Sequence, residues 1–254
     1  MPVQKRVEFL VCGTQKAGTT ALADYLRSHP KLYIPAQKEL HFFDEESQEW
    51  DGNGMATAGH DGYHKHFAAA PRDAIWGEAT PIYMYWDPAP MRIWAYNSAM
   101  HIIVILRNPI ERAYSHWAME LGRGAEQLSF CDALTEEAER CRSALPAQHR
   151  VYSYTDRGFY ASQIRRLWRF FGRDRVLVLR QEELRHSPQI CLDRVCNYLG
   201  IAPLTGVEAR DRHVGSYQQP MERAARQRLT EMFEPEIRQL EQMLGWDCSG
   251  WLEG

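Results

Sequence analysis

Three short, mainly apolar runs along the chain predict buried strands. They span residues 7–12, 101–107 and 176–179. Their apolar residues are consecutive rather than alternating with polar ones, which is typical of strands covered on both faces. Because such strands belong to parallel sheets flanked by helices, the pattern indicates the α/β class.

Helical spacing follows the first of these strands. Leu22, Tyr25 and Leu26 recur at intervals of three and four, which predicts a helix that starts near Thr19 and ends before Pro30. Similar spacing predicts further helices at about 111–121, 129–142, 159–171, 188–199 and 221–244, with Pro235 kinking or dividing the last. Strands that alternate with helices predict a three-layer α/β domain around a central, mostly parallel sheet.

The composition changes little along the chain, so we expect residues 1–254 to form a single domain. Residues 44–73 are rich in glycine, histidine, aspartate and asparagine, which predicts a loop or excursion that shapes a substrate cleft. The aromatic-rich segment 82–86 is expected mostly in the core.

The charge balance excludes several classes of partner. The chain has 30 lysines and arginines against 33 aspartates and glutamates, so no overall positive field favours nucleic acid or an anionic membrane. The apolar stretch near the N-terminus is too short for a signal peptide or a membrane span. The six cysteines lack metal-ligand spacing and are not needed as disulfides in a chain of this length, which predicts no metal site and a cytoplasmic location.

The segment between the first strand and the first helix has the composition of a phosphate-binding loop. It reads Gly-Thr-Gln-Lys-Ala-Gly-Thr-Thr from Gly13 to Thr20. The glycines permit a tight loop, Lys16 is a mobile cation, and the helix N-terminus attracts anions through its backbone N–H groups. The predicted anion-binding residues are Gln15, Lys16, Ala17, Gly18, Thr19 and Thr20.

This loop departs from the Walker A motif of ATP- and GTP-binding proteins. Lys16 stands between the glycines, whereas the motif requires lysine directly after the second one, where this chain has Thr19. The second strand ends in Arg107 rather than in the aspartate that helps to hold magnesium. A nucleotide or small-molecule kinase therefore remains only an alternative hypothesis.

Three segments resemble the PAPS-dependent sulfotransferases, in which PAPS is 3′-phosphoadenosine 5′-phosphosulfate. The likeness is closest to the branch of the heparan sulfate sulfotransferases and their bacterial relatives. The segments read FLVCGTQKAGTTAL from Phe9, KELHFF from Lys38 and ILRNPIERAYS from Ile105. In the second, Leu40 stands where proline is common in the family.

The resemblance implies roles for individual residues. The loop from Gln15 to Thr20 would bind the 5′-phosphosulfate, with Lys16 stabilising the leaving phosphate and Glu39 acting as the catalytic base. His41 follows two residues later, so an extended segment would turn both side chains to one side. Arg107 and Ser115 would bind the 3′-phosphate, since arginine offers paired donors.

Two weaker likenesses extend the match. The segment 77–83 is similar to an acceptor-side segment in which some relatives have lysine at the position of Ala79. The segment 212–217 resembles a late loop that closes over the nucleotide, but a lysine common there is missing, and Arg212 or His213 would substitute for it. The implied nucleotide-binding residues of this loop are Arg212, His213, Gly215, Ser216 and Tyr217.

The resemblance predicts an enzyme that moves a sulfuryl group from PAPS to an acceptor and releases PAP, the desulfated nucleotide, without a metal. The expected acceptor is a hydroxyl of a glycan or of a glycosylated or small metabolite. A second alternative is a non-catalytic module that binds PAPS or PAP, because binding and chemistry use the same residues. The sequence leaves the oligomeric state open.

Overall fold

The chain divides into two compact units. A computed structural model describes residues 5–207 and 220–253. The first unit contains the described residues of Met1–Leu106 and Arg166–His213, and the second those of Arg107–Arg165 and Val214–Gly254. The division falls between Leu106 and Arg107, the last two residues of the second predicted strand.

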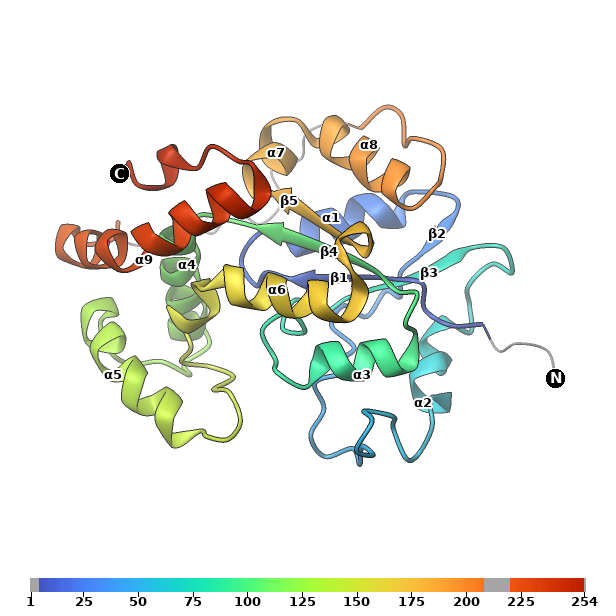
Figure 1. Cartoon of the computed structure of the whole chain (residues 1–254), viewed down its shortest axis with the longest axis horizontal. Helices are drawn as coiled ribbons and strands as arrows, with labels where there is room; N and C mark the ends of the chain where they lie inside the picture. Colours follow the sequence, from blue (N-terminus) through green and yellow to red (C-terminus); the bar gives the residue numbers. More distant parts are fainter. Residues whose placement is uncertain (1–4, 208–219, 254) are drawn as a thin grey trace. The chain divides into compact units, whose positions relative to one another are not determined.

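The first unit is built on a parallel β-sheet, as the sequence predicts (Figure 1). Among the described residues the sheet has five strands in the order β2-β3-β1-β4-β5, and all neighbouring pairs are parallel. The strands are β1 (Phe9–Gly13), β2 (Leu32–Tyr33), β3 (Ile75–Ala79), β4 (His101–Leu106) and β5 (Val176–Arg180). The predicted α/β class is therefore confirmed.

The register brings the carboxyl ends of the central strands to one edge of the sheet. Val11 in β1 lies opposite Ala79 in β3 and Ile103 in β4. The pairing of β1 with β4 then shifts between Val11 and Gly13, so β1 is irregular where it leads into the loop. Segments that follow β1 and β3 consequently start side by side, which is where parallel sheets hold their ligands.

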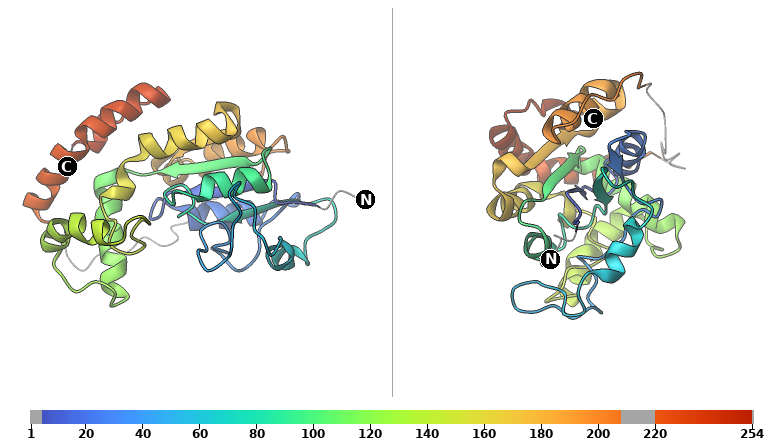
Figure 2. Two further views of the ribbon diagram at one scale, coloured as in Figure 1. Left: turned by 60° about the horizontal axis from the view of Figure 1, so that its bottom comes forward. Right: turned by 90° about the vertical axis from the view of Figure 1, so that its right-hand side faces the viewer.

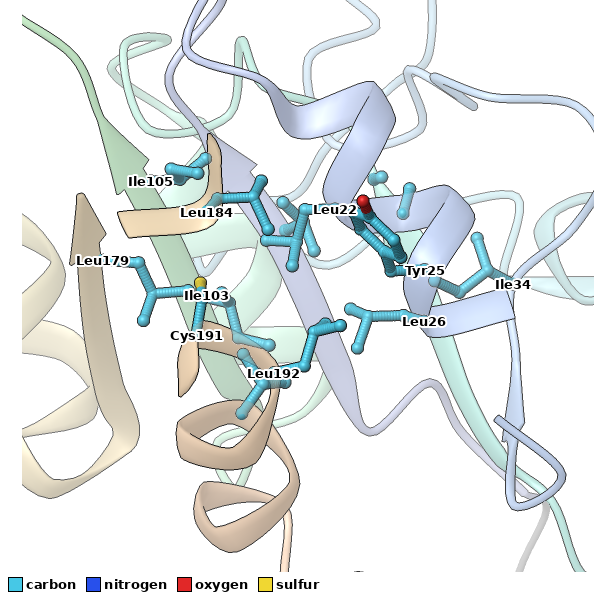
Figure 3. Packing of buried hydrophobic residues seen from close by; sticks show 14 of the residues in the cluster. Leu22, Tyr25, Leu26, Ile34, Ile103, Ile105, Leu179, Leu184, Cys191 and Leu192 are labelled. Atoms are coloured by element: carbon cyan, nitrogen blue, oxygen red, sulfur yellow. The ribbon is translucent and has the colours of Figure 1, made fainter. Parts of the chain in front are cut away.

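Helices cover both faces of this sheet (Figures 1 and 2). On one face, residues of α1, α7 and α8 pack against β1, β4 and β5, in a cluster that includes Leu22, Leu26, Ile103, Leu184 and Leu192 (Figure 3). The helices of the first unit are α1 (Thr19–Arg27), α2 (Asp61–His64), α3 (Ala89–Tyr96), α7 (Gln181–His186) and α8 (Pro188–Tyr198), with a 3₁₀ turn at Lys65–Phe67.

The second unit is helical. Its helices are α4 (Pro109–Gly122), α5 (Phe130–Ser143) and α9 (Arg223–Leu244), and α6 (Tyr160–Phe171) begins in this unit and ends in the first. Asn108 caps α4 by accepting from the N–H of Ile110 (2.9 Å), and Pro109 fits the first turn because it has no N–H to satisfy. Pro235 lies inside the single helix α9, so it does not divide that helix.

Three predicted strands and six predicted helices are present, and their bounds coincide with the predicted ones or differ from them by at most three residues. The sequence did not predict β2, β3, α3 or α7. Residues 44–73 were expected to be a loop, but they also contain α2 and a 3₁₀ turn. The segment 82–86 lies in the core as expected, with each side chain at most 7% exposed.

Candidate active site

The predicted phosphate loop connects β1 to α1, and backbone hydrogen bonds fix its start. The N–H of Thr14 donates to the carbonyl of Ile105 in β4 (2.8 Å), and the N–H of Ala17 donates back to the carbonyl of Thr14 (3.1 Å). Lys16 and Gly18 both have a left-handed backbone, with φ of 71° and 93°. Two left-handed residues within three positions curl the loop tightly at the end of the strand.

The helix that follows this loop has the features of an anion site. Gly18 is the N-cap of α1 and makes no side-chain cap, and the first turn contains no acidic residue. Backbone N–H groups at such a terminus and the positive end of the helix dipole favour a phosphate. The side-chain hydroxyls of Thr19 and Thr20 belong to the same turn. The chemistry predicted for Gln15 to Thr20 therefore fits the local structure.

A support beneath the loop was not predicted from the sequence. A Cβ at Gly13 would lie 2.6 Å from Sδ and 2.9 Å from Cβ of Met84, so only glycine fits here. The N–H of Met84 donates to the carbonyl of Cys12 (2.8 Å). Arg166 in turn donates to the carbonyls of Met84 (2.8 Å) and Tyr85 (2.9 Å). These residues are distant in sequence, and only the folded chain brings them together.

Glu39, the predicted base, is tethered to the neighbouring strand. Its backbone N–H donates to the carbonyl of Ala79, the last residue of β3 (3.2 Å). Ala79 lies opposite Val11 in β1, two residues before Gly13. The backbone of Glu39 is thus fixed at the same edge of the sheet from which the phosphate loop starts.

The side chain of Glu39 is one end of a chain of charged and polar groups. Oε1 of Glu39 pairs with Lys38, and Oε2 lies 3.6 Å from Nε2 of His41. Nδ1 of His41 lies 3.0 Å from Oδ2 of Asp44. The side chain is 35% exposed in Glu39, 44% in His41 and 0% in Asp44. The buried carboxylate of Asp44 can orient the imidazole, while the side chain of Glu39 remains partly accessible to solvent.

The segment is not extended, although Glu39 and His41 do approach each other. Their φ angles are 63° and 56°, so both residues are left-handed and the segment turns. Among the described residues, the non-glycine residues with positive φ are Lys16, Glu39 and His41. These are the three residues predicted to be catalytic, and such strained positions cluster at functional sites.

Asp44 is the site residue that sequence analysis missed. It follows His41 by three positions, a spacing that would indicate an interaction only if the local conformation were known. The buried side chain accepts from Nδ1–H of His41 at 3.0 and 3.1 Å, which leaves Nε2 directed to Glu39. Asp44 is therefore a positioning group for His41.

A second buried carboxylate lies in the segment that was expected on the acceptor side. Glu78 is 1% exposed and accepts from the hydroxyls of Tyr63 (2.5 Å), Thr80 (2.5 Å) and Tyr83 (2.8 Å). Burial raises the pKa of Glu78 above that of an ordinary glutamate, because the charged form is desolvated. Glu78 is enclosed by its partners and supports the end of β3 rather than addressing a substrate.

The two residues predicted to bind the 3′-phosphate belong to the second unit. Arg107 directly precedes Asn108, the N-cap of α4, and Ser115 is a buried residue on that helix. NH2 of Arg107 lies 3.9 Å from Oε2 of Glu111, whereas Arg226 contacts Oε1 of Glu111 at 2.5 Å. Glu111 thus has a closer cationic partner than Arg107. The role of Arg107 and Ser115 stays a prediction.

The late-loop residues Arg212, His213, Gly215, Ser216 and Tyr217 lie outside the described residues. Within 5–207 and 220–253, no group of three or more histidine, cysteine, aspartate or glutamate side chains is arranged to hold a metal ion. Over the same ranges, no helix has both the length and the apolar character to cross a membrane. All six cysteines are free thiols.

Comparison with known proteins places this fold and site in context. Residues 6–225 match the sulfotransferase domain family. Human heparan sulfate glucosamine 3-O-sulfotransferase 6 is 30% identical over 76% of this chain, and the mouse bifunctional heparan sulfate N-deacetylase/N-sulfotransferase 4 is 29% identical over 77% of it. The matches cover only 52% and 22% of these two relatives.

A bacterial structure is similar over almost the whole chain. The sulfotransferase from Alicyclobacillus acidocaldarius superposes with a TM-score of 0.80 and is 30% identical, and the match covers 97% of this chain and 99% of that one. Together with the family match over residues 6–225, this similarity establishes that the chain belongs to the sulfotransferase family.

Proposed function

We propose that this sulfotransferase moves a sulfuryl group from PAPS to a hydroxyl of a saccharide or glycosylated small molecule, with Glu39 as the base. The observation that supports this most directly is the pairing of two features at adjacent strand ends. The anion-binding loop follows β1, and Glu39 is tethered to the last residue of β3. Such an arrangement suits the transfer of an anionic group to a hydroxyl.

In the proposed reaction the acceptor oxygen attacks sulfur in line with the departing phosphate oxygen. A bond from sulfur to the acceptor oxygen forms, the bond from sulfur to the phosphate oxygen breaks, and PAP leaves. Glu39 accepts the hydroxyl proton, and His41, oriented by Asp44, holds the carboxylate in place. Lys16 and the loop N–H groups stabilise the negative charge that develops on the phosphate. Arg107 and Ser115 bind the 3′-phosphate.

The names of the curated relatives support a saccharide acceptor, because both act on heparan sulfate. The chain spans about half of the length of the first relative and about a fifth of the second. Since the whole relatives act on heparan sulfate, a saccharide acceptor for this chain is a proposal. A cytoplasmic location likewise stays a prediction.

Calorimetric titration with PAP tests the donor site. We expect wild type to bind PAP without a metal, and Lys16→Ala and Arg107→Ala each to weaken binding by about 10- to 100-fold, since a hydrogen bond to a charged group contributes ~1.5–3 kcal/mol. Lys65→Ala, which removes an exposed lysine of the first unit, is the matched control for Lys16→Ala and should bind as wild type does. Magnesium-dependent ATP binding with no response to PAP would instead establish the kinase alternative.

Transfer of radiolabelled sulfate from PAPS tests the chemistry. Neutral saccharides, sulfated saccharides and phenols serve as acceptors, and the product is separated by chromatography. Glu39→Gln keeps the size of the side chain and removes the base, so kcat should fall by about 10²- to 10⁴-fold while PAP affinity is unchanged. Full activity in Glu39→Gln would contradict the assignment of the base. PAP binding without transfer by wild type would favour the non-catalytic module.

A further inference from the structure

Arg92 is a buried arginine that hydrogen-bonds the segment containing Asp44. It lies on α3 and is only 5% exposed. NH1 donates to the carbonyl of Phe43 (3.0 Å) and to Oε1 of Glu46 (2.9 Å), while NH2 donates to Oε2 of Glu46 (3.0 Å). The planar guanidinium thus binds a carboxylate through both oxygens and a backbone carbonyl at the same time.

Two tryptophans complete this arrangement. Nε1 of Trp86, a side chain only 3% exposed, donates to Oε1 of Glu46 (2.7 Å). The guanidinium of Arg92 lies over the ring of Trp50, 4.3 Å from its centroid, which adds a cation–π contact. Because Glu46 itself is half exposed, its position depends on Arg92 and Trp86 rather than on burial.

Arg92 hydrogen-bonds residues on both sides of Asp44. Phe43 precedes Asp44, and its N–H donates to the hydroxyl of Tyr83 (3.3 Å) while its carbonyl accepts from Arg92. Glu46 follows two residues after Asp44. The segment around Asp44 is therefore held by residues 83–92 at two backbone groups of Phe43 and at the side chain of Glu46. The segment itself contains no helix or strand.

We infer that Arg92 is a positioning residue for catalysis, which acts through Phe43 and Glu46 to hold Asp44 against His41 and so to aim Glu39. This inference rests on the proposed function of Glu39. A buried guanidinium needs hydrogen-bonding partners in any role. What points to positioning is where the partners lie, because both partners of the Arg92 guanidinium, the carbonyl of Phe43 and the carboxylate of Glu46, flank the buried end of the Glu39–His41–Asp44 chain.

Arg92→Lys is the appropriate variant. Lysine keeps the charge and most of the length, but a single ammonium group cannot reproduce the planar fork that serves Phe43 and both oxygens of Glu46. Glu46→Gln is a second variant that changes only a half-exposed side chain and is expected to leave the fold intact. Arg157→Lys is the matched control, because Arg157 is a buried arginine of the second unit that hydrogen-bonds Ser153 and the carbonyl of Arg150.

The first measurement is hydrogen–deuterium exchange followed by mass spectrometry. In Arg92→Lys, peptides that cover residues 38–46 should exchange about 10-fold faster or more than in wild type, while peptides that cover the phosphate loop should be unchanged. Arg157→Lys should leave residues 38–46 as protected as in wild type. Unchanged protection of this segment in Arg92→Lys would overturn the inference whether or not an acceptor is known.

The second measurement is the rate of sulfuryl transfer from PAPS to an acceptor that the wild-type enzyme uses. We expect Arg92→Lys to lower kcat by about 10- to 100-fold with less than a threefold change in KM for PAPS, since small misplacements of catalytic groups have effects of this size. In an Asp44→Asn background the same substitution should lower kcat by less than about threefold, because Arg92 acts through Asp44. Glu46→Gln should show a smaller loss in the same direction.

The outcomes separate the inference from the proposed function. Equal losses of kcat from Arg92→Lys in both backgrounds would show that Arg92 does not act through Asp44 and would overturn the inference, as would turnover equal to that of wild type. An inactive wild type would refute the proposed function and the catalytic part of the inference together. In that case, faster exchange of residues 38–46 in Arg92→Lys would still show that Arg92 fixes this segment.

Discussion

The left-handed backbone at Glu39 predicts that glycine is more stable than alanine at this position, although neither residue should support transfer. Glu39 has a φ of 63°. A residue with a Cβ is disfavoured in this conformation by about 1–2 kcal/mol, whereas glycine adopts it freely. Glu39→Ala and Glu39→Gly both remove the carboxylate, so the two variants differ only in the presence of the Cβ.

The expected difference in the free energy of unfolding between Glu39→Gly and Glu39→Ala follows from two opposing effects. Glycine relieves the left-handed strain of about 1–2 kcal/mol but loses more backbone entropy on folding, by roughly 0.5–1 kcal/mol. The free energy of unfolding should therefore be about 1 kcal/mol higher for Glu39→Gly than for Glu39→Ala. Glu136 supplies the matched control, because it is an exposed residue inside α5 where glycine should be about 1 kcal/mol worse than alanine.

Urea denaturation measures the free energy of unfolding of each variant, and the comparison holds if the variants share the same dependence on urea concentration. The transfer assay measures activity. Both variants at position 39 should lose transfer to the same extent, since neither has a carboxylate, while both variants at position 136 should keep it. The sign of the difference between glycine and alanine should reverse between the two positions. If glycine were less stable than alanine at position 39 by as much as at position 136, the argument from the left-handed backbone would be refuted.

Three further substitutions test other parts of the site. Gly13→Ala should displace Met84, lower the free energy of unfolding by about 1–3 kcal/mol in urea denaturation, and weaken PAP binding in calorimetry. Wild-type values in both measurements would contradict the close contact between position 13 and Met84. Asp44→Asn should lower kcat by about 100-fold without changing PAP affinity, because the amide lacks the charge that orients His41; a loss confined to PAP affinity would count against this role. Burial raises the pKa of Glu78 above the ordinary 4.5, so the contribution of Glu78 to the free energy of unfolding is complete below pH 4.5 and is lost as the pH rises through the folded pKa. Glu78→Gln should remove this fall in stability with rising pH. A pH profile of stability identical to that of wild type would show that Glu78 does not cause it.

The sequence predicted the strands that are continuous apolar runs and missed those that are not. The strands β1, β4 and β5 are buried on both faces, so their composition alone identifies them. In contrast, β3 contains Gly77 and Glu78, and a charged residue in a strand interior argues against a buried strand. Glu78 is tolerated only because three hydroxyl groups from distant residues donate to it. That condition is tertiary and cannot be found by local pattern.

Candidate site residues could be named from the sequence where a motif specifies residue types, but not where a contact depends on backbone conformation. Lys16, Glu39 and His41 were named through motif resemblance and position, and their catalytic roles stay a prediction. The proximity of Glu39 to His41 was expected from an extended segment, but the actual left-handed turns bring the two side chains to 3.6 Å by another path. The same turns bring His41 to Asp44, a contact that spacing alone does not imply.

These turns also explain why the segment needs support from the rest of the first unit. A stretch with two left-handed residues forms no regular hydrogen-bond ladder and is not favoured by its own sequence. Its conformation is imposed from outside, by the carbonyl of Ala79 on Glu39 and by Tyr83 and Arg92 on either side of Phe43. A rigid strand end and a buried arginine thus hold an unfavourable backbone in the geometry that presents the carboxylate. In the proposed function, the carboxylate of Glu39 is partly exposed while the backbone of its segment is held by partners that are buried.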